Sequence, residues 1–136
     1  LAQIFFNENS IHFLNNASPE YFEGFRTLFL YYREWLAGQK MDPAYFCVDG
    51  SAVLAVYGLR QARDLDFLHF GGKKIYTGIP MVESHNTEEH HHVTTRDDII
   101  FNPENHFYYE GVKFVSLNIL RAMKEKRNEE KDICGF

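Results

Sequence analysis

Residues 48–67, which read VDGSAVLAVYGLRQARDLDF, decide the fold of this chain. An apolar strand pattern ends at Gly50-Ser51, a short Ala- and Val-rich segment follows, and a second strand pattern carries Asp64 and Asp66. The Gly-Ser turn favours a helix for the middle segment. Because side chains alternate along a strand, the two aspartates are expected to project from one face. The stretch therefore predicts a strand–turn–helix–strand unit with paired carboxylates near its end.

This unit carries the groups that phosphoryl transfer requires. Two neighbouring carboxylates repel each other unless a cation lies between them, and Mg²⁺ is bound by a few carboxylates together with substrate phosphates. Backbone N–H groups at the start of a helix bind phosphate, which is the arrangement expected at Gly50-Ser51. Arg60 and Arg63 flank the acids and are candidates to neutralise phosphate charge. These residues indicate metal-dependent chemistry on a phosphorylated substrate.

Each feature also has a simpler interpretation. The aspartates fit a solvent-facing strand neutralised by the two arginines, and Gly50-Ser51 fits an ordinary strand-to-helix turn. The run His90–His92 predicts a mobile polar loop, because consecutive residues cannot all face one ion. His69 and His85 are expected to be structural. The cations near the end of the chain either stabilise a helix C-terminus or contact substrate: Lys124, Arg127 and Lys131.

The bulk composition describes one domain over residues 1–136. Hydrophobic residues make up 45% and aromatic residues 16%, which is enough for a core and argues against disorder. A net charge of −5 argues against a long nucleic-acid partner. The apolar runs are too short to span a membrane, and the two cysteines form no metal or redox motif, so a cytoplasmic location is expected. The chain begins with Leu1 rather than Met, and we expect a fragment or domain of a longer polypeptide.

Apolar spacing predicts the remaining elements. Ser18 and Pro19 mark the start of a helix that ends near Gly38. Its helical spacing predicts a core stripe of Phe22, Phe25, Phe29, Tyr32 and Leu36. The patterns also predict strands over residues 44–48, 65–70 and 98–101, a helix over 51–58, a hairpin over 106–115 and a helix after Ser116. Residues 1–16 fit either short strands or packed loop, and residues 73–92 show no clear pattern. This order predicts an α+β fold, an α/β sandwich in which helices flank a small mixed β-sheet.

Three motifs resemble the signature of the DNA polymerase β-like nucleotidyltransferase superfamily, in particular its small bacterial members. They are Gly50-Ser51, Gly58-Leu59-Arg60 and Arg63-Asp64-Leu65-Asp66. The C-terminal pattern is also similar, with a strand that leads into a helix bearing Met123-Lys124, Arg127 and Lys131-Asp132. The likeness covers residues 45–132 and implies a nucleotidyltransferase-like fold.

The resemblance implies a role for each matched residue. Gly50 and Ser51 would hold the terminal phosphates of a nucleoside triphosphate, and Asp64 and Asp66 would bind Mg²⁺ or Mn²⁺. Family members add a third carboxylate, which helps to deprotonate the acceptor hydroxyl. Asp98 is the first choice for this catalytic and metal-binding role, ahead of Glu83 and Glu110. Asp49 stands where the family often has Gly, which adds negative charge beside the proposed phosphate site.

Two classes of function remain open on this basis. The first is a metal-dependent nucleotidyltransferase that moves a nucleoside monophosphate onto a hydroxyl of a small molecule, sugar or protein. The second is a catalytically degenerate nucleotidyltransferase-like module, for binding or as an accessory domain of a larger, for example glycan-modifying, protein. The position of Asp98 separates them, because an enzyme is favoured where its carboxylate converges with Asp64 and Asp66.

Overall fold

The computed structural model describes residues 19–72, 74–86 and 91–131. The helices are α2 (Pro19–Ala37), α3 (Ser51–Val56), α4 (Arg96–Phe101) and α5 (Leu117–Lys131), with 3-10 helices η1 (Pro43–Tyr45) and η3 (Pro103–Asn105). The strands are β1 (Phe46–Asp49), β2 (Leu65–His69), β3 (Val82–Ser84), β4 (His106–Tyr109) and β5 (Val112–Val115). The predictions for residues 1–16, for Ser18 and for the Phe22 side chain lie outside the described part of the chain. No described helix is long and apolar enough to cross a membrane.

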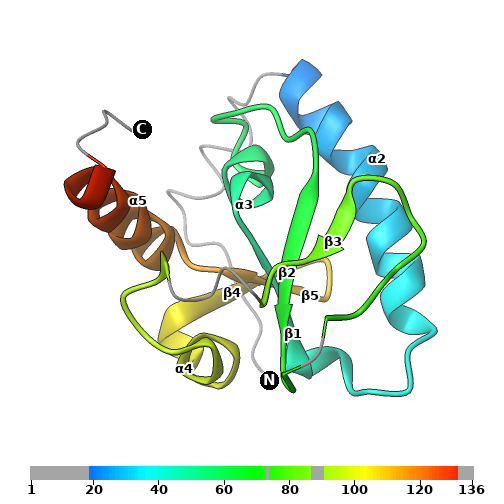
Figure 1. Cartoon of the computed structure of the whole chain (residues 1–136). Coiled ribbons are helices and arrows are strands. Elements are labelled where there is room, and N and C mark those ends of the chain that lie inside the picture. Colours follow the sequence, from blue (N-terminus) through cyan, green and yellow to red (C-terminus); the bar gives the residue numbers. More distant parts are fainter. Residues whose placement is uncertain (1–18, 73, 87–90, 132–136) are drawn as a thin grey trace.

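The described strands form one mixed sheet in the order β3-β2-β1-β5-β4. β1 pairs antiparallel with β2 and parallel with β5, and β2 pairs parallel with β3. β4 and β5 form the predicted hairpin, with positive φ angles of 48° at Glu110 and 79° at Gly111 in its turn. Figure 1 shows α2 along one side of the sheet and α4 and α5 on the other. The predicted α+β fold with a mixed sheet flanked by helices is confirmed.

The aromatic stripe of α2 forms the core on one face of the sheet. Phe25, Phe29 and Tyr32 are fully buried, as their helical spacing predicts. The ring of Phe29 stacks 6.0 Å from that of Phe114 on β5, and Tyr32 lies 5.3 Å from Phe67 on β2. Because these residues pack beneath α2, their neighbours along each strand face the opposite side of the sheet.

The strand–turn–helix–strand unit over residues 48–67 forms as predicted. Gly50 has φ 72° and ψ −150°, a conformation that L side chains rarely adopt, and the chain turns there from β1 into α3. Residues 52–56 of α3 are all buried. Their small Ala and Val side chains let the helix lie close to the sheet and to α2 (Figure 1). Asp66 lies in β2, and Asp64 directly precedes the strand.

The prediction of a strand over residues 98–101 is wrong, because these residues belong to helix α4. Thr95 is the N-cap of α4 and accepts a hydrogen bond from the Asp98 backbone N–H at 3.1 Å. Asp97 and Asp98 occupy the first turn, where the helix dipole favours negative charge. These local signals outweigh the strand preference of Ile99-Ile100. The segment without a clear pattern, residues 73–92, contributes the short edge strand β3.

Candidate functional site

Three acidic residues lie in one row across the strands, on the face opposite α2. Asp49 of β1 is the register partner of Asp66 on β2, and Asp66 is the partner of Glu83 on β3. Phe67 packs against α2, so the preceding Asp66 projects from the other face. Partner residues on neighbouring strands share a face, and this acidic row therefore concentrates negative charge at one place.

Asp66 is the centre of this charge. Burial raises the pKa of Asp66 from 3.8 to about 6, and the carboxylates of Asp64, Asp49 and Glu83 contribute to the rise. His85 opposes the shift, with its Nδ1 4.0 Å from Asp66 Oδ2. Asp64 is thus close enough to Asp66 for its charge to contribute to this rise.

The Gly50 turn lies directly beside Asp66. A Cβ placed on Gly50 would be 3.5 Å from Asp66 Oδ2, so the turn predicted to hold phosphate and the acid predicted to hold metal are neighbours. An inner pocket of about 240 Å³ contains both, together with Ser51 and Arg60. An outer pocket of about 600 Å³ is lined by Ser51, Arg60, Arg63 and Asp64, so the two pockets adjoin at Ser51 and Arg60. All the predicted site residues except Asp98 line one or both of them.

Cations from α5 line the inner pocket together with the acids. Lys124 and Arg127 line it together with Arg60. Burial lowers the pKa of Lys124, and the nearby charges of Arg60 and Arg127 lower it further. The pocket is therefore bipolar, with carboxylates from the sheet and a cluster of three cations among its lining residues.

Asp49 is held by a histidine that the sequence placed in a polar loop. His92 Nε2 lies 2.7 Å from Asp49 Oδ2, and both residues are buried. Asp49 Oδ1 accepts the Gly50 backbone N–H at 2.8 Å. Burial would raise the pKa of Asp49, but the hydrogen bonds from His92 and Gly50 lower it below its ordinary value. The mobile-loop interpretation is therefore wrong for His92, and Asp49 is an ionised carboxylate held by two hydrogen bonds at the turn.

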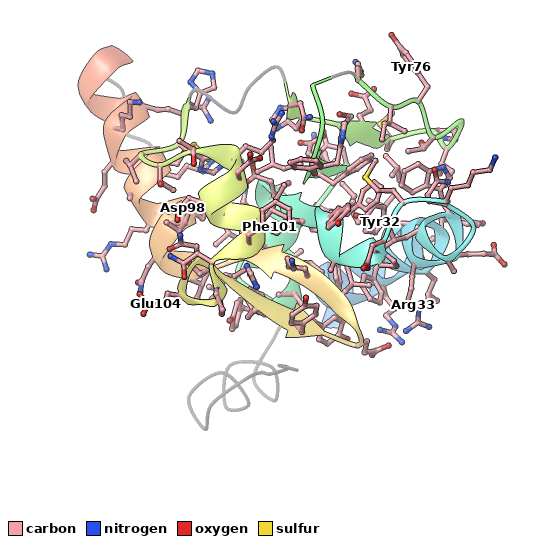
Figure 2. The ribbon with its side chains drawn as sticks, turned by 90° about the horizontal axis from the view of Figure 1, so that it is seen from below. Tyr32, Arg33, Tyr76, Asp98, Phe101 and Glu104 are labelled. Carbon is pink, nitrogen blue, oxygen red and sulfur yellow. The ribbon has the colours of Figure 1, made fainter. Side chains whose placement is uncertain are left out.

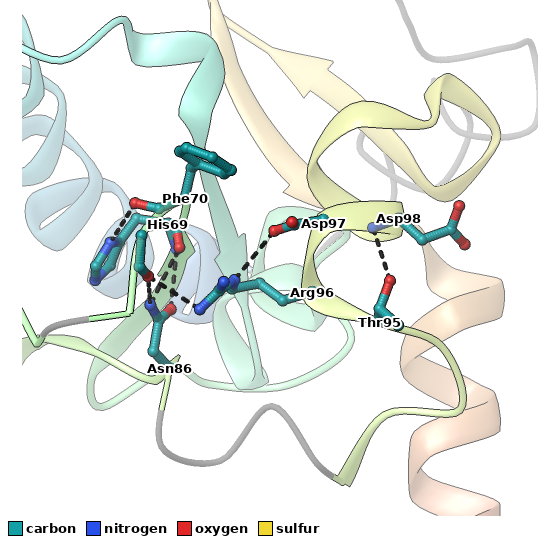
Figure 3. Close-up of polar contacts among 8 residues, drawn as sticks. His69, Phe70, Asn86, Thr95, Arg96, Asp97 and Asp98 are labelled. Atoms are coloured by element: carbon teal, nitrogen blue, oxygen red, sulfur yellow. Dashed lines mark hydrogen bonds and ion pairs between the residues drawn. The ribbon is translucent and has the colours of Figure 1, made fainter.

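Asp98 has other partners than the acid pair. Its Oδ2 accepts from Thr94 Oγ1 at 2.7 Å and from Asn105 Nδ2 at 2.8 Å, and these contacts join α4 to η3. Hydrogen bonds from Thr94, Asn102 and Asn105 hold the pKa of Asp98 below its ordinary value. Figure 3 shows its carboxylate pointing away from the cluster of His69 and Asn86, and Figure 2 shows it on α4. Asp98 therefore stabilises local structure.

The other two candidates for the third carboxylate, Glu83 and Glu110, lie in different parts of the structure. Glu83 belongs to the acidic row, whereas Glu110 lies in the β4–β5 turn and binds Arg26 at 2.6 Å and Arg33 at 2.8 Å. Glu83 is thus the acid nearest the predicted role. Among the described residues, no group of three or more His, Cys, Asp or Glu side chains is already arranged to hold a metal ion.

The structural interpretation of His69 is confirmed. Its Nε2 lies 3.0 Å from Ser84 Oγ and its Nδ1 3.1 Å from the Phe70 carbonyl. Asn86 accepts the His69 backbone N–H and donates to the carbonyls of His69 and Gly71 (Figure 3). This network closes the end of β2 and fixes the chain that carries His85.

Comparisons with models of protein families, with curated proteins and with solved structures return no match for this chain. The geometry of the acidic row, the Gly50 turn and the cations that line the inner pocket is what supports a functional proposal.

Proposed function

We propose that this chain is a metal-dependent nucleotidyltransferase of the DNA polymerase β-like type, which moves a nucleoside monophosphate from a nucleoside triphosphate to an acceptor hydroxyl. The observation that carries the proposal is the bipolar inner pocket, which Asp66 and the Gly50 turn line together with Arg60, Lys124 and Arg127. Carboxylates suit a metal and cations suit phosphates, and a metal–triphosphate complex needs both.

The oxygen atoms of the acids are of the kind that a hard divalent cation prefers. Asp64, Asp66 and Glu83 offer carboxylate oxygens, which are the ligands that Mg²⁺ and Mn²⁺ prefer. Their mutual repulsion contributes to the raised pKa of Asp66, and a cation between them would relieve it. Bound there, the metal would stabilise the charge that develops on the transferred phosphoryl group.

The protein residues supply position and charge. Ser51 and Arg60 belong to both pockets, so the phosphates would lie at their junction, with Lys124 and Arg127 against them from α5. Arg63 lines the outer pocket, which has room for the sugar and base. The acceptor hydroxyl attacks the α-phosphorus in line, its bond to phosphorus forms, and pyrophosphate leaves. Positioning and electrostatic stabilisation account for the rate, without a covalent intermediate.

The second candidate is a nucleotide-binding or accessory module without catalysis. It is favoured by the position of Asp98 outside the acidic row and by the lack, among the described residues, of a preformed three-ligand group. Both candidates require nucleotide binding at the same pockets. They differ in whether pyrophosphate is released.

Thermal unfolding with ATP, GTP, CTP and UTP, each with and without Mg²⁺, tests the proposal. One nucleotide should raise Tm in a metal-dependent way, because a ligand at 100 times its Kd stabilises by about 2.7 kcal/mol. Asp66→Asn should abolish this response. Asp97→Asn, which changes an exposed carboxylate on α4, should keep it. Pyrophosphate release from the stabilising nucleotide supports the enzyme, binding without release supports the module, and no response to any of the four contradicts both.

Gly50→Ala gives a second, independent test of the phosphate site. The methyl group would enter a positive-φ turn beside Asp66, and strain of this kind costs about 1–3 kcal/mol. Gly111→Ala is the matched control, because Gly111 also has a positive φ of 79° but nothing within 4 Å of the added methyl and no place in either pocket. Both variants should lose stability, and only Gly50→Ala should lose the metal-dependent nucleotide response. Equal nucleotide responses in the two variants would remove the turn from the site.

A further inference from the structure

The buried histidine of the inner pocket has a ring nitrogen without a hydrogen-bond partner in the described part of the chain. His92 is 5% exposed, and its Nε2 lies 2.7 Å from Asp49 Oδ2. Its Nδ1 is buried, and no described residue gives it a hydrogen bond. Buried polar atoms without a partner are rare in folded proteins, and those that occur often bind a water or an ion or take part in catalysis.

The contact with Asp49 decides which nitrogen carries the proton. Asp49 is ionised, so its carboxylate only accepts hydrogen bonds, and Nε2 must donate to it. In the neutral ring Nδ1 then holds a lone pair and accepts a proton. A histidine whose tautomer and orientation are fixed by a carboxylate is the arrangement of a general base.

The surroundings of His92 are those that the proposed reaction needs. His92 lines the same inner pocket as Ser51, Asp66 and Lys124. The third carboxylate that the sequence assigned to proton transfer, Asp98, is committed to Thr94 and Asn105 instead. Glu83, the remaining acid of the row, lines neither of the two pockets. Among the described residues of the inner pocket, the only buried titratable atom without a hydrogen-bond partner is Nδ1 of His92, which is therefore the candidate base for the acceptor hydroxyl.

We propose that His92 is the general base that accepts the proton of the acceptor hydroxyl, and that Asp49 is the residue that positions it. This inference rests on the proposed function. As the hydroxyl oxygen bonds to the α-phosphorus, its proton passes to the lone pair of His92 Nδ1, and the bond between the α-phosphorus and the bridging oxygen of pyrophosphate breaks. The imidazolium that results is stabilised by the Asp49 carboxylate and returns its proton to solvent after product release.

His92→Gln tests the base while keeping an amide N–H that can donate to Asp49. Pyrophosphate release is measured from the stabilising Mg²⁺–nucleotide, with glycerol as the hydroxyl probe. General bases contribute about 10²–10⁴-fold, so the rate should fall by this factor while the Tm increase caused by the nucleotide is kept. His106→Gln is the matched control, because its imidazole bonds the Ile99 carbonyl and lines neither pocket. An unchanged rate in His92→Gln overturns the inference.

The tautomer of His92 gives a readout that does not depend on turnover. Nitrogen-15 shifts of the ring in the whole chain should show a protonated Nε2 and an unprotonated Nδ1, and Asp49→Asn should disturb this preference. A proton on Nδ1 of the neutral wild-type ring overturns the inference. The two proposals fail separately, because a wild-type chain that binds none of the four nucleotides contradicts the proposed function, whereas full transfer by His92→Gln contradicts only the general base.

Discussion

The charge of Asp66, a central residue of the candidate site, lowers the stability of the folded chain. Its carboxylate is half-buried on β2 between Asp49 and Glu83, and burial is the largest cause of its raised pKa. A chain selected for stability alone would place a neutral side chain here, because an ionised carboxylate is costly in such surroundings. A charge that destabilises the folded chain is a common property of ligand-binding sites.

Asp66→Asn should therefore stabilise the metal-free protein above pH 6. The folded pKa of about 6 exceeds the ordinary value of 3.8, so the folded state binds more protons than the unfolded state between these values. The stability that protonated Asp66 contributes is fully present below the lower value and falls as pH rises through the upper one, by about 3 kcal/mol in total. Urea unfolding at pH 4 and pH 8 measures this: the variant should match wild type at pH 4 and exceed it at pH 8. A variant that is less stable at pH 8 would show that the Asp66 charge is compensated in the folded state.

Sequence alone could predict some of these residues but not all of them. Asp64 and Asp66 stand one residue apart, and Gly50-Ser51 ends the preceding strand, so their proximity follows from strand alternation and a short connection. The bond between Asp49 and His92 joins residues 43 positions apart, and no local spacing predicts it. The sequence did indicate that Asp49 has a partner, because it is an acid at the end of a buried strand and a buried charge must be paired.

Helix α4 is an element whose type hydrophobic periodicity alone does not predict. The helix has six residues, and two consecutive Ile residues over so short a span fit a strand as well as a helix. The residues that indicate a helix are at its start, where Thr95 is the N-cap and two acids follow in the first turn. The α2 stripe was predictable because its spacing repeats along a long helix, and the β4–β5 hairpin because Gly111 marks its bend.

Thr95→Ala should weaken α4 by removing the acceptor for the Asp98 backbone N–H. Loss of an N-cap oxygen costs about 1 kcal/mol. Thr95→Ser is the matched control, because it keeps the oxygen and should cost only a few tenths of a kcal/mol. Hydrogen exchange of the amide of Asp98 and of the next turn measures the local effect, and urea unfolding measures the global one. If both variants behave alike, the cap does not determine the helix start.

In the molecule as a whole, one face of the sheet forms the core and the other carries the candidate site. Beneath α2 lie fully buried aromatic rings, and on the other face lie the acidic row, His92 and the cations of α5. Because alternate residues of each strand serve opposite faces, β1 and β2 contribute to the core and to the site in the same few residues. The core face can therefore set the position of the site without contacting it.

Phe29→Ala tests this division. Phe29 is fully buried and contacts the rings of Phe25, Tyr109 and Phe114, so the truncation should cost about 3–5 kcal/mol of unfolding free energy. Leu30→Ala on the same helix, where the side chain is 43% exposed, should cost less than about 1 kcal/mol. Phe29→Ala should have a lower Tm than wild type but should keep the metal-dependent Tm increase with nucleotide. Asp66→Asn should lose this increase despite its higher stability. A nucleotide response that falls in proportion to stability in both variants would mean that the two faces are not independent.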